Sequence, residues 1–368
     1  MKRKIKSNNA ITLVALVVTI VILLILSGIS ISALTNTEIF QKVKEAKEKS
    51  ENAQKQENEI LDKYEKEMDQ HIDNTLVYNF NSGKIKIGDY IKYEPDTITD
   101  TDENYNTVIL NLKKYSGSGY NKTETLKQES LDWRVLDVKD GHVRLISSKP
   151  TNSKIELYGF NGYNNAVKLL DDTCKVLYTN TKFTQNAQNL KFDDITQFML
   201  KKPELDNTEY NPKKIYYPNI FILEENNITD ALDNQTKLKE SEQRDYIINA
   251  SYAESKTLKN TNWTQYLTKD SFSNEKYYEL FISQNLKDYD ETYWLSSRCA
   301  FASTGGACFN LRRIKGGQVT YNDLYSTNCN QAFSKLSYRP VITLNSSVQL
   351  DIQNSGDGSS PEKAYAIK

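Results

Sequence analysis

The sequence predicts an α+β protein in which a long N-terminal transmembrane α-helix leads into a mixed head of short antiparallel strands and helices. Three observations support this class: an unbroken apolar run near the N-terminus, a charged stretch without Pro or Gly after it, and alternating apolar and polar segments from Lys84 onward. With 368 residues, the chain has room for an anchor and a head with a sizeable core.

The apolar run, Ile11–Ile31, contains no charged residue. A helix of about 20 residues crosses a hydrocarbon core of about 30 Å. Four basic residues and no acid precede the run, so the positive-inside rule places the N-terminus in the cytoplasm. We therefore expect a basic leader over residues 1–10, a transmembrane helix over 11–34 and an extracellular head. This is a single-pass protein of the cell membrane, with the lipid bilayer as a partner.

Two other interpretations of the run are a signal anchor without further processing and a cleaved signal peptide, whose apolar core would be shorter. The order of a Lys-rich leader, Ala10, Ile11 and a long apolar helix resembles a type IV prepilin. The resemblance implies cleavage between Ala10 and Ile11 by a prepilin peptidase, methylation of Ile11, and pilin-like partner subunits of a fibre or type II secretion system. Ala10 replaces the family's usual Gly, and Ala15 replaces its usual Glu.

Residues 35–73 predict a helical stalk, because Glu, Lys, Gln and Ala predominate there and apolar residues recur every three or four positions. A simple stalk and a short coiled coil both agree with so narrow a stripe. The apolar positions are Ile39, Phe40, Val43, Ala46, Ile60, Leu61, Tyr64 and Met68.

The head is predicted to begin at Lys84 with a strand that ends before Pro95. Asp140-Gly141 between two alternating segments is a strong hairpin signal. Residues 164–178 change to a helical period, and Asp193 or Asp194 suits the cap of a short helix. The acidic residues 100–104 form at most a weak calcium candidate, because Tyr105 stands where such a loop needs Gly, and we expect a solvated loop and no metal.

Four further strands are expected in the C-terminal third, at Glu291–Arg298, Ala307–Ile314, Gly317–Tyr321 and Tyr338–Leu344. Together with the hairpin they resemble a domain of unassigned function found in exported proteins of Gram-positive bacteria. More distantly, the pattern is similar to the C-type-lectin and formylglycine-generating-enzyme fold. The resemblance covers residues 84–348, leaves 349–368 as a turn-rich tail, and singles out Trp294, Arg298 and Arg339 as the head motif.

Cys299, Cys308 and Cys329 lie close together in the sequence. The similarity to formylglycine-generating enzymes implies a possible copper or redox site for paired thiols, whereas a disulfide and buried free thiols are the structural alternatives. The chain has only two histidines, which leaves little for a histidine-based zinc site or a Ser-His-Asp triad. We expect no cofactor.

The net charge of −1 gives no basic surface for nucleic acid. We therefore expect a pilin-like surface protein, a minor pilin, pseudopilin or adhesin that binds an extracellular glycan or protein and is not an enzyme. The alternatives are an exported oxidase of the formylglycine-generating type and a purely structural surface protein.

Overall fold

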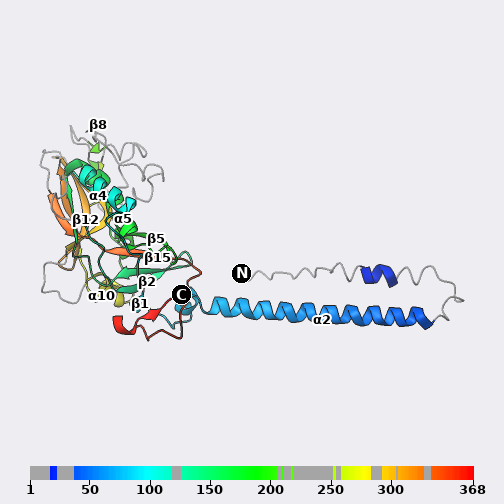
Figure 1. Ribbon diagram of the computed structural model, residues 1–368. Helices are drawn as coiled ribbons and strands as arrows, with labels where there is room; N and C mark the ends of the chain where they lie inside the picture. Colours follow the sequence, from blue (N-terminus) through cyan, green and yellow to red (C-terminus); the bar gives the residue numbers. More distant parts are fainter. Residues whose placement is uncertain are drawn as a thin grey trace. The chain divides into compact units, whose positions relative to one another are not determined.

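The computed structural model describes ten segments of the chain: residues 17–22, 37–117, 126–204, 209–210, 217–218, 252–253, 258–282, 292–303, 306–326 and 333–368 (Figure 1). They fall into two compact units, Met1–Asp73 and Asn74–Lys368. The second unit contains both helices and mixed sheets, so the α+β class is correct for it.

The predicted transmembrane helix is wrong for the part of the chain that the structure describes. None of the described helices combines the length and the apolar character needed to cross a bilayer. Within the apolar run the structure describes residues 17–22, and these are helical. The finding also overturns the single-pass topology with a cytoplasmic N-terminus and an external head. Ala10 and Ile11 lie outside the described residues.

The first unit contains one long helix, α2, from Thr37 to Asp73. Its sequence combines strong helix formers with an i,i+4 ion pair between Lys47 and Glu51 (3.7 Å). The predicted stalk residues 35–73 therefore form one continuous helix from Thr37 onward.

The second unit is built on two six-stranded sheets. The first has the order β16-β1-β2-β3-β15-β5. All its pairs are antiparallel except β1 with β16, which is parallel. Its strands are β1 (Tyr90–Lys92), β2 (Trp133–Lys139), β3 (His142–Ser147), β5 (Thr184–Asn189), β15 (Pro340–Leu344) and β16 (Tyr365–Ala366).

The second sheet has the order β10-β13-β12-β11-β14-β4, with β11 and β14 parallel. Two-stranded pairs β6–β9 and β7–β8 lie outside both large sheets. The strands are β4 (Lys154–Tyr158), β6 (Glu209–Tyr210), β7 (Tyr217–Pro218), β8 (Tyr252–Ala253), β9 (Leu258–Lys259), β10 (Gln265–Tyr266), β11 (Thr292–Ser303), β12 (Gly306–Lys315), β13 (Gln318–Ser326) and β14 (Phe333–Ser337).

Short helices complete the unit, and α5 is the central one because it contacts strands of both large sheets. The β2–β3 turn is the Asp140-Gly141 hairpin that the sequence predicts, with both residues at positive φ (50° and 75°). The helices are α3 (Leu76–Asn81), α4 (Glu103–Tyr115), α5 (Gly159–Tyr178), α6 (Phe192–Thr196), η3 (Lys269–Ser271), α10 (Lys276–Phe281) and η4 (Pro361–Lys363).

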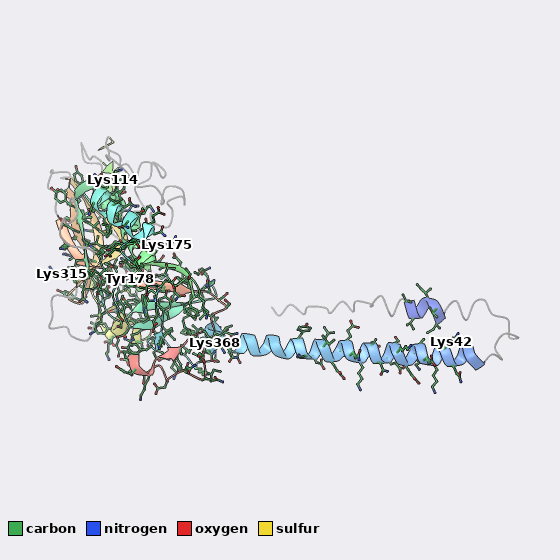
Figure 2. All side chains as sticks on the ribbon, in the orientation of Figure 1. Lys42, Lys114, Lys175, Tyr178, Lys315 and Lys368 are labelled. Carbon is green, nitrogen blue, oxygen red and sulfur yellow. The ribbon has the colours of Figure 1, made fainter. Side chains whose placement is uncertain are left out.

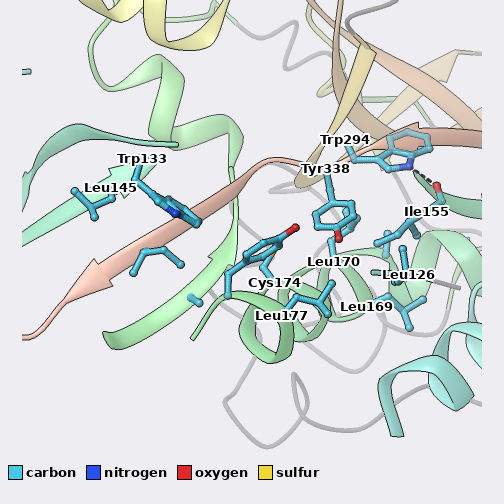
Figure 3. Close-up of a cluster of buried hydrophobic side chains, with 14 of the residues drawn as sticks. Leu126, Trp133, Leu145, Ile155, Leu169, Leu170, Cys174, Leu177, Trp294 and Tyr338 are labelled. Carbon is cyan, nitrogen blue, oxygen red and sulfur yellow. Dashed lines mark hydrogen bonds between the residues drawn. The ribbon is translucent and has the colours of Figure 1, made fainter. Parts of the chain in front are cut away.

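The larger core lies around α5, whose Leu170 and Cys174 are fully buried (Figure 3). Trp294 of β11 is also fully buried, and its indole Nε1 donates to the carbonyl of Ile155 on β4 (2.9 Å). This bond joins two strands of the same sheet that are separated by β14. The core therefore satisfies the indole N–H of Trp294 internally.

The boundaries of the second unit differ from the sequence prediction at both ends. The unit begins at Asn74 rather than Lys84, since α3 belongs to it. The tail 349–368 is an integral part, because Gln349 bridges to Thr75 and β16 pairs with β1.

Candidate functional site

The candidate site is a pair of surface grooves on the second unit, one on each side of the extended segment 93–98. Groove A has a volume of about 470 Å³ and lies between residues 90–95 and 128–133, with Pro361 and Ala364 at its rim. Groove B has a volume of about 460 Å³. It lies between residues 96–98, α4 and the C-terminal part of α5.

Groove A opens where β1 and β2 separate. Ile91 pairs with Trp133 across the antiparallel ladder, and no further pair follows toward Lys92. Beyond this point the two chain segments form opposite walls. Tyr90, Pro95 and Pro361 give the groove apolar surface, and the charged lining residues are Lys92, Glu94, Glu129 and Asp132.

Trp133 closes the inner end of groove A. The residue is 1% exposed and packs edge-on against Tyr93 (5.2 Å) and Tyr178 (5.9 Å). Its indole Nε1 has no hydrogen-bond partner within the described residues. A buried N–H without a partner costs free energy, so the wall of groove A holds a donor that the described part of the fold does not use.

The segment between the grooves is held by the side chain of Gln128. Its Nε2 donates to the carbonyls of Asp96 and Leu177 (both 2.7 Å), while its Oε1 accepts from the backbone N–H of Ile98 (3.2 Å). One amide thus binds three backbone groups and fixes the segment against the end of α5.

Further hydrogen bonds hold the same segment from α5 and the turn after it. The hydroxyl of Tyr93 donates to the carbonyl of Tyr178 (2.6 Å), and the amide of Asn180 donates to the carbonyl of Glu94 (2.9 Å). The carboxylate of Asp96 accepts from the backbone N–H of Thr181 (2.8 Å). The common wall of the two grooves is therefore preorganised before any ligand arrives.

Groove B is lined mostly by polar residues, and Ile98, Val108 and Val176 contribute its apolar surface. Its carboxylates come from Asp96, Asp102 and Asp172, and its single cation is that of Lys175. All three carboxylates already have partners, because Asp96 accepts from Thr181 N (2.8 Å), Asp102 caps α4 at Tyr105 N (2.9 Å) and Asp172 binds Lys168 (2.7 Å). The remaining polar lining consists of Thr97, Asn104, Thr107, Asn111, Thr179 and Thr181.

The acidic residues 100–104, which the sequence predicted to be a solvated loop, include the start of α4 and contribute Asp102 and Asn104 to this groove. Residues 103–115 form α4, with Asp102 as its N-cap. Asp102 therefore serves the helix terminus. Across the described residues, no group of His, Cys, Asp or Glu has a geometry that could hold a metal ion.

The thiols of the sequence prediction lie on neighbouring strands of the second sheet. Cys299 pairs with Asn310, and Cys308 pairs with Phe301, so the two thiols are diagonal neighbours on one face. Both are free thiols. Burial raises the pKa of each to about 11, which keeps them protonated at neutral pH. Cys329 lies outside the described residues.

The head motif Trp294, Arg298 and Arg339 lies in the interior, with all three side chains at most 2% exposed. Arg298 lies with its guanidinium 5.6 Å from the centre of the Tyr163 ring. Arg339 donates from its two terminal nitrogens to the carbonyls of Ser147 (3.0 Å), Ser148 (3.1 Å) and Phe281 (3.1 Å). These contacts brace loops of the fold, and the motif does not line either groove.

Sequence reasoning therefore missed the grooves. Gln128, the residue that fixes their common wall, stands in a polar stretch with no periodicity. Its importance depends on Asp96, Ile98 and Leu177 being brought together from distant parts of the chain.

Comparison of the chain with models of protein families, with curated proteins and with solved structures found no match.

Proposed function

We propose that the second unit acts by binding, and that its ligand is a neutral, hydroxyl-rich saccharide held along groove A, groove B or both. The observation that carries the proposal is the pair of preorganised polar grooves on either side of residues 93–98. Sites that bind small ligands combine a preformed concave surface with a few well-placed polar groups.

The charges of the grooves favour a neutral ligand over an acidic one. Groove A has three carboxylates and one ammonium group, and groove B has the same. Such a surface repels phosphates and sulfates, whereas carboxylates and amides accept hydrogen bonds from sugar hydroxyls. Tyr90 and the prolines of groove A offer apolar surface to the C–H face of a sugar ring.

The thiols give less support to the oxidase alternative. A copper or nucleophilic role needs a thiolate, and the raised pKa of Cys299 and Cys308 opposes its formation. Prepilin processing at Ala10 and Ile11 stays a prediction, which intact-mass and N-terminal analysis of the native protein tests.

The saccharide proposal is tested by applying the full chain to an array of neutral, N-acetylated and sulfated oligosaccharides, followed by calorimetry on the neutral compounds that bind. Asn111→Ala removes an amide from groove B, and Asp132→Asn removes a charge from groove A. We expect a loss in affinity of about fivefold for the variant of the occupied groove, because losing a hydrogen bond, or exchanging a charged acceptor for a neutral one, costs about 1 kcal/mol.

Asn106, in the same helix as Asn111, and Asp140, at the opposite end of β2 from Asp132, supply matched controls. Asn106→Ala changes an exposed amide of α4 outside groove B. Asp140→Asn changes an exposed carboxylate in the β2–β3 turn, where Asn tolerates positive φ. Both controls should bind as the wild type does. Binding only to sulfated compounds, binding to none of the saccharides, or equal losses in variants and controls would contradict the proposal.

A further inference from the structure

Helix α2 has an uncovered stripe along one side. From residue 41 to residue 64 every side chain is exposed except Ser50, which is half-buried. Large apolar residues on the stripe are strongly exposed, with Val43 at 45%, Leu61 at 53% and Tyr64 at 62%. At 3.6 residues per turn, these three residues point within about 40° of the direction of Ser50.

The stripe has large residues at both ends and small ones in the middle. Val43 lies toward the first end, and Leu61 and Tyr64 lie toward the second. Ser50 and Ala53 lie between them. If a second α2 crosses antiparallel with its midpoint between Ser50 and Ala53, Val43 of each helix meets Leu61 of the other. The small residues then meet at the centre, where the backbones approach most closely.

The charges along α2 also favour an antiparallel arrangement of the two helices. Residues 37–55 carry five lysines and four glutamates, whereas residues 56–73 carry two lysines and seven carboxylates. In a parallel pair the acidic halves of the two helices would lie side by side and repel each other. An antiparallel pair places the acidic half of each helix beside the lysine-bearing half of the other.

Particular charged residues match in this arrangement. Lys47 comes opposite Glu57, which interrupts the stripe, and Lys44 comes opposite Asp62 on the same flank. All four side chains are exposed in the single chain, and Lys47 forms an ion pair with Glu51 of its own helix (3.7 Å). Figure 2 shows the described side chains of α2 pointing outward from the helix.

We infer that α2 binds α2 of a second copy of this chain in an antiparallel, two-fold symmetric coiled coil. Each copy contributes the same stripe, so the contact is isologous and closes as a dimer. The dimer buries the exposed apolar ends and neutralises the acidic half of the helix. The contact is independent of the grooves and of any saccharide.

Sedimentation equilibrium of the full chain tests the inference through charge reversal. In Lys44→Glu/Lys47→Glu, the antiparallel partner meets like charges, so we expect the dissociation constant to rise at least about tenfold, since each of four symmetry-related pairs becomes repulsive. Adding Glu57→Lys and Asp62→Lys to the same chain should restore dimerisation. In a parallel pair each residue would face the same residue of the other helix. The exchange would therefore leave like charges opposite one another and would not restore dimerisation.

Lys55→Glu/Lys63→Glu is the matched control. It makes the same change in net charge at positions about 140° around the helix from Ser50, and its dimer should be retained. Far-UV circular dichroism verifies that every variant keeps its helix. A monomeric wild-type chain, or a quadruple variant that remains as weak as the double variant, would overturn the inference.

Discussion

Arg144 of β3 holds two buried carboxylates together, Asp137 of β2 and Asp194 of α6. Its Nε donates to Asp137 (2.6 Å). Of its two terminal nitrogens, Nη2 also donates to Asp137 and Nη1 donates to Asp194. All three residues are at most 6% exposed. The two carboxylates raise the pKa of Arg144 against the opposing effect of burial, so the triad ties the start of α6 to the first sheet.

Removing Arg144 should therefore destabilise the second unit strongly. In Arg144→Leu both carboxylates lose their partner inside the protein, and we expect the free energy of unfolding to fall by about 3–5 kcal/mol. Urea unfolding of the wild type and the variant measures this fall in the free energy of unfolding. Lys168→Ala, which breaks the more exposed pair with Asp172, should lower the free energy of unfolding by at most about 1 kcal/mol. Equal losses in the two variants would show that the triad is not the stronger interaction.

Arg339 should not tolerate replacement by lysine. Its guanidinium binds carbonyls of Ser147, Ser148 and Phe281, which one ammonium group cannot reach together. We expect Arg339→Lys to lose about 2–4 kcal/mol in the free energy of unfolding, since hydrogen bonds to a charged group contribute about 1.5–3 kcal/mol each. Arg134→Lys, where a single carbonyl bond to Gly88 is at stake, should lose less. The reverse order would contradict the bracing role.

The thiols should react in the order of their exposure. Cys299 is fully buried, whereas Cys308 is only half-buried, and burial raises the pKa of both to about 11. At pH 8 a disulfide reagent should modify Cys308 slowly and Cys299 only after denaturant is added. Peptide mass spectrometry assigns each site. Fast modification of Cys299 in the native protein would argue against a sealed interior at β11.

Asp171 should make stability depend on pH. It accepts hydrogen bonds from Ser296 Oγ (2.9 Å) and Asn189 N (3.1 Å), but burial outweighs them and Lys191, and raises its pKa above the ordinary value. The folded state therefore binds this proton more tightly than the unfolded state. The stability that the proton contributes is complete below about pH 4, and it is lost as pH rises through the folded-state pKa.

The variant Asp171→Asn removes this titration. Urea unfolding between about pH 3.5 and pH 7 should show the wild type losing stability relative to the variant as pH rises. Titrations of other groups are shared by the two proteins and cancel in the difference. A difference that stays constant, or one in which the wild type gains with rising pH, would refute the prediction.

The sequence predicted the local elements better than their assembly. The β2–β3 hairpin is correct, because Asp140-Gly141 sets the turn by itself. The helix predicted at residues 164–178 is α5 with one more turn before it. The helix α4 was missed, since Asp102 and its neighbours were read as a solvated loop although Asp102 is a good N-cap.

Long-range contacts could not be predicted from local pattern. The parallel pairing of β1 with β16 and the position of Gln128 depend on segments far apart in the chain. The transmembrane prediction rested on the length and lack of charge of the apolar run and on the basic leader, whereas none of the described helices can span a membrane. The head motif was recognisable as large buried side chains, but nothing in its residues indicated the two grooves.

Gln349 pairs with Thr75 near the start of the second unit and exchanges backbone hydrogen bonds with Lys368, so the two end regions of the unit lie together. Leu76 N donates to Val348 O, and Leu350 N donates to Asn74 O (both 2.9 Å). The seam therefore forms only after nearly the whole unit has been synthesised. The same adjacency makes the unit suited to circular permutation, with the old ends joined by a short linker and new ends opened at the Asp140-Gly141 turn.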